Sequence, residues 1–274
     1  FWSMGLLARD DWKAQWIGLD RPVGRDDTTE YTRLSARYVR KEFQVGKRIR
    51  NATAYICGLG LYELSINGKK VGNEVLAPAQ TQFNKTVLYN TYDVTGSLAR
   101  GANAIGVILG NGRYFTMRKS KNANFGFPKM VLQVEIVFVD GTKQLITSDG
   151  TWKITGDGPI TENNEYDGEK YDARKEMDGW DKVGFDDTAW SSAEVLRMPS
   201  ERLAAQMNEP IRITESITPI AVKKIRPGVF IFDMGQNMVG WAKLRVRATA
   251  GTRIRMRFAE SLEADSLYLA NIRD

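Results

Sequence analysis

The sequence predicts an all-β protein built around an antiparallel sandwich. Apolar and polar residues alternate with a period of two, and turn dipeptides such as Asn67-Gly68 and Asp140-Gly141 separate the alternating runs. No stretch longer than about ten residues carries an apolar stripe with helical spacing. With 274 residues, of which 42% are hydrophobic, the chain is long enough for one or two domains with a sizeable core.

The clearest hairpin follows Tyr62, Leu64 and Ile66, which alternate with polar residues and should share one face of a strand. Asn67-Gly68 then supplies the positive φ angles that a tight turn needs. We therefore expect the chain to return directly alongside this strand.

Two further strands are predicted downstream. Residues 104–109 form a fully buried strand that ends at Gly110-Asn111-Gly112. Residues 130–138 form a long strand, which turns at Asp140-Gly141 and returns through Leu145 and Ile146.

The pattern divides the chain into four parts. Residues 1–30 are expected to be an entry segment left from or joining an upstream β-domain, and residues 31–200 to form the carbohydrate-binding-like sandwich. Residues 201–218 lose the periodicity, contain Pro210 and predict a linker. Residues 219–274 predict the first strands of a second, incomplete β-domain, because so few strands bury little surface alone.

Three strands are expected in this second part, at residues 229–232, 241–247 and 253–258. In the last two, arginines alternate with apolar residues, which is typical of the wet face of a half-buried sheet. We favour this interpretation over a nucleic-acid surface, although the net charge is +6.

Composition excludes several functions. The chain has no histidine, so Ser-His-Asp, Cys-His and His-zinc sites cannot form within it. Cys57 is the one cysteine and lies in an apolar run, which predicts a core residue. No apolar run approaches the ~20 residues that cross a bilayer, so we expect no membrane partner.

The loop at residues 178–190 carries Trp180, Phe185 and Trp190 between polar residues. Tryptophan in such a loop can stack on sugars, but we expect these aromatic side chains to cap the end of the sandwich core.

Eight segments resemble, in the same order, the N-terminal region of bacterial α-L-rhamnosidases. They are Met4 to Leu19, Tyr62 to Pro78, Tyr89 to Thr95, Gly101 to Phe115, Tyr166 to Arg174, Phe185 to Trp190, Phe232 to Trp241 and Ala259 to Leu262. Each segment is weak evidence by itself, whereas the shared order over nearly the whole chain is specific.

The resemblance implies jelly-roll or galactose-binding-like sandwiches ahead of an (α/α)6 barrel, which would begin beyond Asp274 and carry the catalytic carboxylates. It implies inverting hydrolysis of terminal α-L-rhamnosides with no organic cofactor. The expected partners are L-rhamnose-containing glycans or glycosides and the catalytic barrel of the same parent chain. Nothing here matches the acid-rich catalytic motif, so this chain alone is predicted to be inactive.

Asp167, Glu169 and Asp172 are the candidates for catalysis within the chain. An inverting pair needs two carboxyl groups held ~6.5–9.5 Å apart. These three can equally cap turns or pair with Lys170 and Arg174, and we therefore expect no catalytic residue.

Sugar binding is the more credible role, since some sandwiches of this family resemble carbohydrate-binding modules and are associated with a calcium-assisted L-rhamnose site. The candidate residues lie in two loops: Asn73, Glu74, Asn111, Arg113 and Tyr114. Asn73, Glu74 and Asn111 offer oxygen ligands for calcium, while Arg113 can donate and Tyr114 can lie against a sugar ring. Their alternative is structural, with Asn111 as a turn residue and Tyr114 closing the core.

Two other functions stay open. The segment Phe185 to Trp190 also resembles galactose-binding-like sandwiches, which favours an autonomous lectin-like module. A purely structural or adhesive β-protein would use the aromatic residues only as core.

Overall fold

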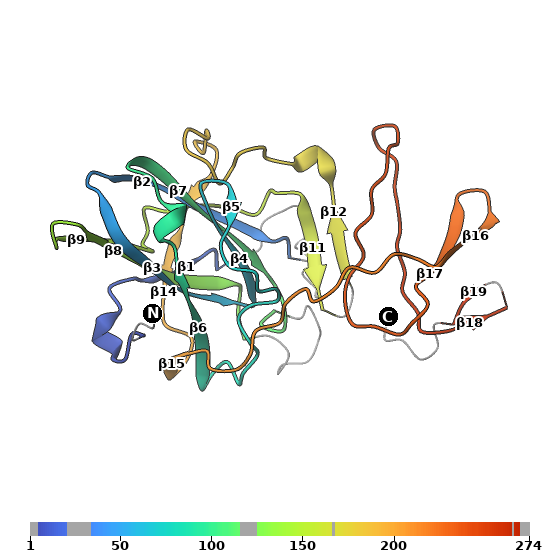
Figure 1. The fold of residues 1–274 in the computed structure, drawn as a ribbon, viewed down its shortest axis with the longest axis horizontal. Helices are drawn as coiled ribbons and strands as arrows, with labels where there is room; N and C mark the ends of the chain where they lie inside the picture. The colour runs from blue at the N-terminus through green and yellow to red at the C-terminus, as the bar shows by residue number, and fades with distance from the viewer. Residues whose placement is uncertain (1–4, 21–33, 116–124, 166–167, 265, 269–274) are drawn as a thin grey trace. The chain divides into compact units, whose positions relative to one another are not determined.

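The computed structural model describes residues 5–20, 34–115, 125–165, 168–264 and 266–268. Strands account for almost all of its regular structure, which confirms the predicted all-β class (Figure 1). Contacts divide the chain into two units, residues 1–213 and 214–274. The described helical elements are three single turns: η1 Arg9–Asp11, η2 Thr95–Ser97 and η3 Ala173–Lys175. None of the helices in the described ranges has the length and apolar character needed to span a bilayer.

The first unit contains two main sheets. The larger has the order β14-β1-β8-β3-β6-β15, with β9 also paired to β8. Its strands are β1 Trp16–Gly18, β3 Ile49–Leu59, β6 Thr86–Asp93, β8 Lys129–Phe138, β9 Lys143–Thr147, β14 Glu194–Leu196 and β15 Arg202–Ala205. The smaller sheet has the order β13-β10-β2-β7-β4-β5. Its strands are β2 Arg37–Val45, β4 Leu61–Ile66, β5 Lys69–Lys70, β7 Gly101–Gly110, β10 Lys153–Thr155 and β13 Ser191–Ser192.

A separate hairpin joins β11 Ile160–Asn164 to β12 Gly168–Tyr171. Its two strands pair with each other and with neither main sheet.

The main core lies between the inner faces of the two sheets. Alternate residues of β8, from Met130 to Phe138, are buried there with Leu64 and Ile66 of β4 and with Trp152. Both predicted hairpins are confirmed, because β4 pairs with β5 and β8 pairs with β9. At the first turn, Asn67 and Gly68 have φ angles of 52° and 77°, as the sequence requires. Cys57 is buried, which confirms its predicted core position.

The first unit takes strands from outside residues 31–200. Within the leading segment, β1 pairs with both β8 and β14. Within the predicted linker, β15 pairs in parallel with β6, and the division between units falls just after Ile213. Short strands of this kind carry too few residues to display alternation, so their partners, not their own pattern, define them.

In the second unit, β16 Ala221–Arg226 pairs with β17 Val229–Asp233, which confirms the strand predicted at residues 229–232. A second pair joins β18 Leu262–Glu263 to β19 Ser266–Leu267. The strands predicted at 241–247 and 253–258 are wrong for this structure, because neither segment is assigned as strand. Leu244 and Phe258 are 43% and 63% exposed. Among the described residues no layer buries their apolar face, and a half-buried sheet needs such a layer.

The loop at residues 178–190 covers the outer face of the smaller sheet. Val39 of β2 points into the main core, whereas its neighbour Tyr38 packs in a separate cluster with Trp180 and Trp190. Trp180 meets Tyr38 edge to face with ring centroids 5.1 Å apart. The prediction that this loop caps the end of the core is therefore corrected, because the loop buries a second, outer aromatic layer.

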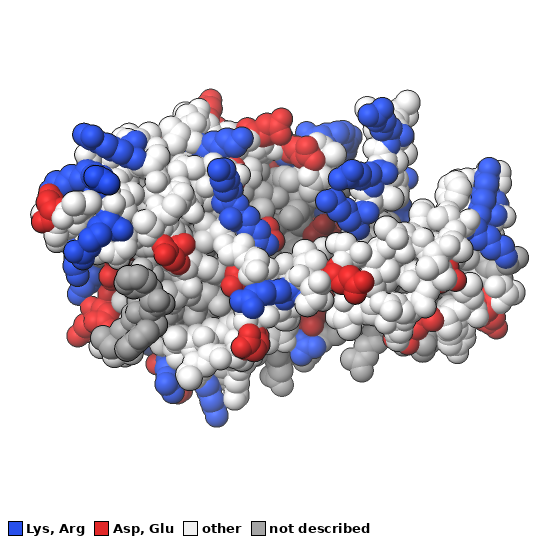
Figure 2. Space-filling view, viewed as in Figure 1, with Lys and Arg blue, Asp and Glu red and all other residues white. Residues whose placement is uncertain are grey.

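Charges are mixed on the surface. In Figure 2, Lys and Arg side chains are interspersed with Asp and Glu side chains over the first unit. Mixed charge of this kind is ordinary for a solvated surface.

Candidate functional site

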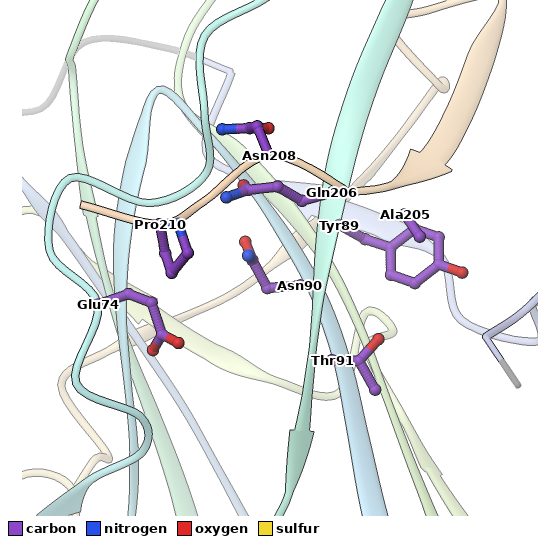
Figure 3. Close-up of a pocket in the computed structure, with 8 residues that line it drawn as sticks. All are labelled: Glu74, Tyr89, Asn90, Thr91, Ala205, Gln206, Asn208 and Pro210. Atoms are coloured by element: carbon purple, nitrogen blue, oxygen red, sulfur yellow. The ribbon is translucent and has the colours of Figure 1, made fainter. Parts of the chain in front are cut away.

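A polar hollow of about 200 Å³ lies beside β6 and β15 (Figure 3). Its lining residues are Glu74, Tyr89, Asn90, Thr91, Ala205, Gln206, Asn208 and Pro210. Three carboxamides and one carboxylate therefore share a small concave surface, which suits a ligand that both donates and accepts hydrogen bonds.

Strand alternation positions Asn90. In Figure 3, the Asn90 side chain lies on the same side of β6 as Gln206, whereas Tyr89 points to the other side. Tyr89 is buried and its hydroxyl donates to the carbonyl oxygen of Leu6 at 3.0 Å. Asn90 therefore faces the hollow, whereas the preceding residue of the strand, Tyr89, belongs to the core.

Gln206 is held at both ends by the first unit. Its backbone N–H donates to the Tyr89 carbonyl at 2.9 Å, and its side-chain Oε1 accepts from the Ala79 N–H at 2.9 Å. The Oδ1 atom of Asn90 accepts from the Tyr62 hydroxyl at 2.9 Å. Within the described residues, the side-chain nitrogens of Asn90 and Gln206 have no protein acceptor, so both amides can donate to a ligand.

Glu74 supplies the carboxylate, and its side chain is 16% exposed. Its Oε2 atom accepts from the Asn73 backbone N–H at 3.0 Å. Its Oε1 atom lies 3.8 Å from Nη2 of Arg212, whose Nε donates to Oδ1 of Asn73 at 2.9 Å. A backbone bridge between Glu74 and Arg212 fixes this arrangement.

Two tyrosines, Tyr62 and Tyr92, lie next to the polar residues of the hollow. The hydroxyls of Tyr62 and Tyr92 lie 3.0 Å apart. Burial raises the pKa of Tyr92 to about 12; the Tyr62 hydroxyl opposes this rise, and the nearby Glu74 carboxylate adds to it. Burial likewise raises the pKa of Tyr62. Both phenols are therefore neutral near pH 7 and act as hydrogen-bond donors or acceptors.

The predicted residues of the second loop have other surroundings. Asn111 is fully buried, and its Nδ2 donates to the carbonyls of Leu34 and Asn163 at 2.7 and 2.8 Å. Arg113 is exposed, and its Nε donates to Glu165 Oε2 at 2.7 Å. None of the residues Asn111, Arg113 and Tyr114 lines the hollow.

Tyr114 is 1% exposed and meets Phe83 edge to face at 5.3 Å, with Phe125 stacked at 6.0 Å. Asn111 and Tyr114 therefore make buried contacts of the kind that a structural role implies. The structure joins only Asn73 and Glu74 of the five residues, through Arg212. Sugar contacts by all five residues stay a prediction.

Sequence reasoning missed Asn90, Gln206, Asn208 and Arg212. Asn90 lies in the segment Tyr89 to Thr95, which carries the family resemblance, so that resemblance could have pointed to it. The other three lie in the predicted linker, where no pattern points to them.

The acidic candidates for catalysis have structural surroundings. Asp172 accepts from the backbone N–H of Arg174 at the start of η3 and pairs with the Arg174 guanidinium at 2.8 and 2.7 Å. These hydrogen bonds lower the pKa of Asp172 to about 2. Burial raises the pKa of Glu169, and Asp167 lies outside the described residues. In the described ranges, no three acidic or cysteine side chains gather as metal ligands.

The fold and the hollow define a class: a two-sheet β-sandwich module with a polar edge site, followed by a separate β-unit. Residues 47–215 match the alpha-L-rhamnosidase N-terminal domain, and residues 223–274 match the bacterial alpha-L-rhamnosidase concanavalin-like domain. Because the first match covers more than half of the chain, the chain belongs to the bacterial α-L-rhamnosidase family.

Individual relatives of this chain are also α-L-rhamnosidases. The chain is 33% identical to an α-L-rhamnosidase of Alteromonas sp. (strain LOR), over 99% of this chain and 30% of the relative. It is 40% identical to one from Streptomyces avermitilis, over 87% of this chain and 24% of the relative. It therefore spans less than a third of the length of these two relatives.

Two solved structures that are similar to this chain are also α-L-rhamnosidases. The crystal structure of the Streptomyces avermitilis α-L-rhamnosidase complexed with L-rhamnose has a TM-score of 0.83 at 39% identity, covering 88% of this chain and 24% of that chain. The α-L-rhamnosidase from Dictyoglumus thermophilum has a TM-score of 0.77 at 44% identity, covering 85% and 26%. Both similarities cover at least 85% of this chain.

Proposed function

We propose that this chain is an accessory, non-catalytic part of an α-L-rhamnosidase that hydrolyses terminal α-L-rhamnosides with inversion. It supports the (α/α)6 catalytic barrel of the same parent chain and binds a terminal L-rhamnose unit in the hollow beside Glu74. The observation that carries the sugar-binding part is the convergence of Glu74, Asn90, Gln206 and Asn208 on one concave surface.

The chemistry of the hollow suits a neutral sugar. Rhamnose presents hydroxyl groups that donate and accept, and the Glu74 carboxylate accepts while the amides of Asn90 and Gln206 donate. Pro210 adds an apolar surface for the methyl group or a ring face. The Streptomyces avermitilis relative was crystallised with L-rhamnose, which makes that sugar the first ligand to test.

The matched extents support the accessory role. The relatives are α-L-rhamnosidases, and this chain corresponds to between 24% and 30% of their length. In the described residues, the Asp172 carboxylate is already paired with Arg174, so it is not free to act in an inverting carboxyl pair.

Calorimetric titration of the 274-residue chain with L-rhamnose tests the sugar-binding proposal. We expect binding in the millimolar to micromolar range that weakens at least tenfold in the double variant Asn90→Ala, Gln206→Ala. The matched control is Asn51→Ala, Gln144→Ala, which removes an asparagine and a glutamine outside the hollow. Equal weakening in both double variants, or no binding of L-rhamnose by the wild type, would contradict the assignment.

A further inference from the structure

Arg212 lies between Asn73 and Glu74, the two loop residues expected to be calcium ligands. Its guanidinium therefore takes the place of a bound cation. Its Nε donates to Oδ1 of Asn73 at 2.9 Å, and its Nη2 lies 3.8 Å from Oε1 of Glu74. The position of Arg212 is fixed by backbone contacts, because Glu74 forms a bridge with Arg212 and the Val75 N–H donates to the Ile211 carbonyl at 2.9 Å. The backbone of Arg212 is thus held beside the loop, while its side chain is 45% exposed.

The Glu74 carboxylate is also engaged on its other side. Oε2 accepts from the Asn73 N–H at 3.0 Å. The same oxygen lies so close to Gly72 that a Cβ there would be only 2.2 Å from it, and the Tyr92 ring would be 2.7 Å from that Cβ. Glycine at 72, with a φ of 76°, therefore lets the backbone approach the carboxylate.

Calcium does not fit this set of donors. The ion takes six to eight oxygen ligands, whereas Glu74 supplies the one carboxylate among the described residues that line the hollow, and Asn73 Oδ1 already accepts from Arg212. Asn111, the third ligand implied by the family resemblance, is buried among Leu34 and Asn163 and does not line the hollow. The Arg212 charge already balances that of Glu74, so a divalent cation beside it would be repelled.

We propose that Arg212 is the resident cation of this site, so that the hollow recognises the hydroxyl groups of a neutral sugar without calcium. The sugar-binding part of this inference rests on the proposed function. The exclusion of calcium rests on the contacts of Arg212 alone.

Two titrations of the EDTA-treated 274-residue chain test the two parts separately. With CaCl2 and no sugar, we expect no site with a Kd below about 1 mM. A single calcium site that disappears in Glu74→Gln would overturn the inference, whether or not any sugar binds.

With L-rhamnose, we expect the same affinity, within twofold, in EDTA and in excess CaCl2. Binding that appears only with calcium would overturn the inference and leave the proposed function standing. No binding in either buffer would refute the proposed function, while the calcium titration would still decide the role of Arg212.

The variant Arg212→Gln supplies a positive test. Removing the guanidinium leaves the partly buried Glu74 carboxylate without its cation, so we expect the melting temperature of Arg212→Gln to fall, with or without calcium. Arg174→Gln is the matched control, because Arg174 pairs with Asp172 outside the hollow. A fall in melting temperature no larger than that of Arg174→Gln would contradict the proposal.

Discussion

The guanidinium of Arg40 in β2 forms an ion pair with the carboxylate of Asp187, which lies 147 residues further along the chain. Arg40 also pairs with Glu42 at 2.5 Å and donates to the carbonyls of Trp180 and Lys182 at 2.8 and 2.9 Å. Its side chain is 1% exposed. One buried arginine therefore fastens the 178–190 loop to the outer face of the smaller sheet.

Replacing Arg40 by Met should lower the free energy of unfolding by about 3–5 kcal/mol, because the change leaves buried or partly buried carboxylates and carbonyls without a donor. Urea unfolding monitored by tryptophan fluorescence measures this loss, and Trp180 and Trp190 lie in the affected layer. The control Arg174→Met removes an arginine that is 77% exposed and should cost less than about 1 kcal/mol. Equal losses of unfolding free energy in the two variants would show that the contacts of Arg40 stabilise the protein no more than those of an exposed arginine.

Asn111→Ala should reduce stability by about 2–3 kcal/mol and leave the affinity for L-rhamnose unchanged in the folded protein. The reason is that the buried Asn111 side chain donates to a buried carbonyl, that of Leu34, and to a partly buried one, that of Asn163. Denaturant unfolding and calorimetry should be measured on the same sample. Weaker sugar binding at unchanged stability would return Asn111 to the sugar site.

Stability should fall between about pH 10 and pH 12. Tyr92 has its pKa raised to about 12 in the folded protein, against about 10 in the unfolded chain. A raised pKa means that the stabilisation is complete below pH 10 and is lost as the pH rises through 12. For Tyr92 this loss is about 2–3 kcal/mol.

The variant Tyr92→Phe tests this directly, because it cannot ionise at residue 92. Denaturant unfolding at pH 9, 10 and 11 should show a shallower decline in the variant than in the wild type. Other buried tyrosines contribute to the decline in both proteins. An identical decline of the unfolding free energy with pH in the two proteins would show that ionisation of Tyr92 does not destabilise the fold.

The purified chain should not hydrolyse an aryl α-L-rhamnoside. Asp172 is held as an ionised cap by Arg174, with a pKa near 2, so it cannot serve as the acid near neutral pH. Release of the aryl group, measured by absorbance, is the assay. Turnover that survives purification and is lost in Asp172→Asn or Glu169→Gln would refute this prediction.

The sequence by itself determined the features that depend on neighbouring residues. The alternation through Tyr62, Leu64 and Ile66 and the positive φ angles of Asn67-Gly68 are local properties, so the first hairpin could be predicted in full. The same holds for β7 and β8, whose apolar faces are long enough to read. Family membership followed from the order of short segments.

The tertiary structure decided which polar residues meet. Gln206 and Asn90 line one hollow because β15 pairs with β6, and Arg212 lies beside Glu74 through a backbone bridge; neither pairing leaves a pattern in the sequence. It also decided that Asn111 and Tyr114 are buried and that Trp180 covers an outer face. The physical reason is that alternation records which side of a strand faces a core, whereas the identity of the partner depends on strand pairing between distant segments.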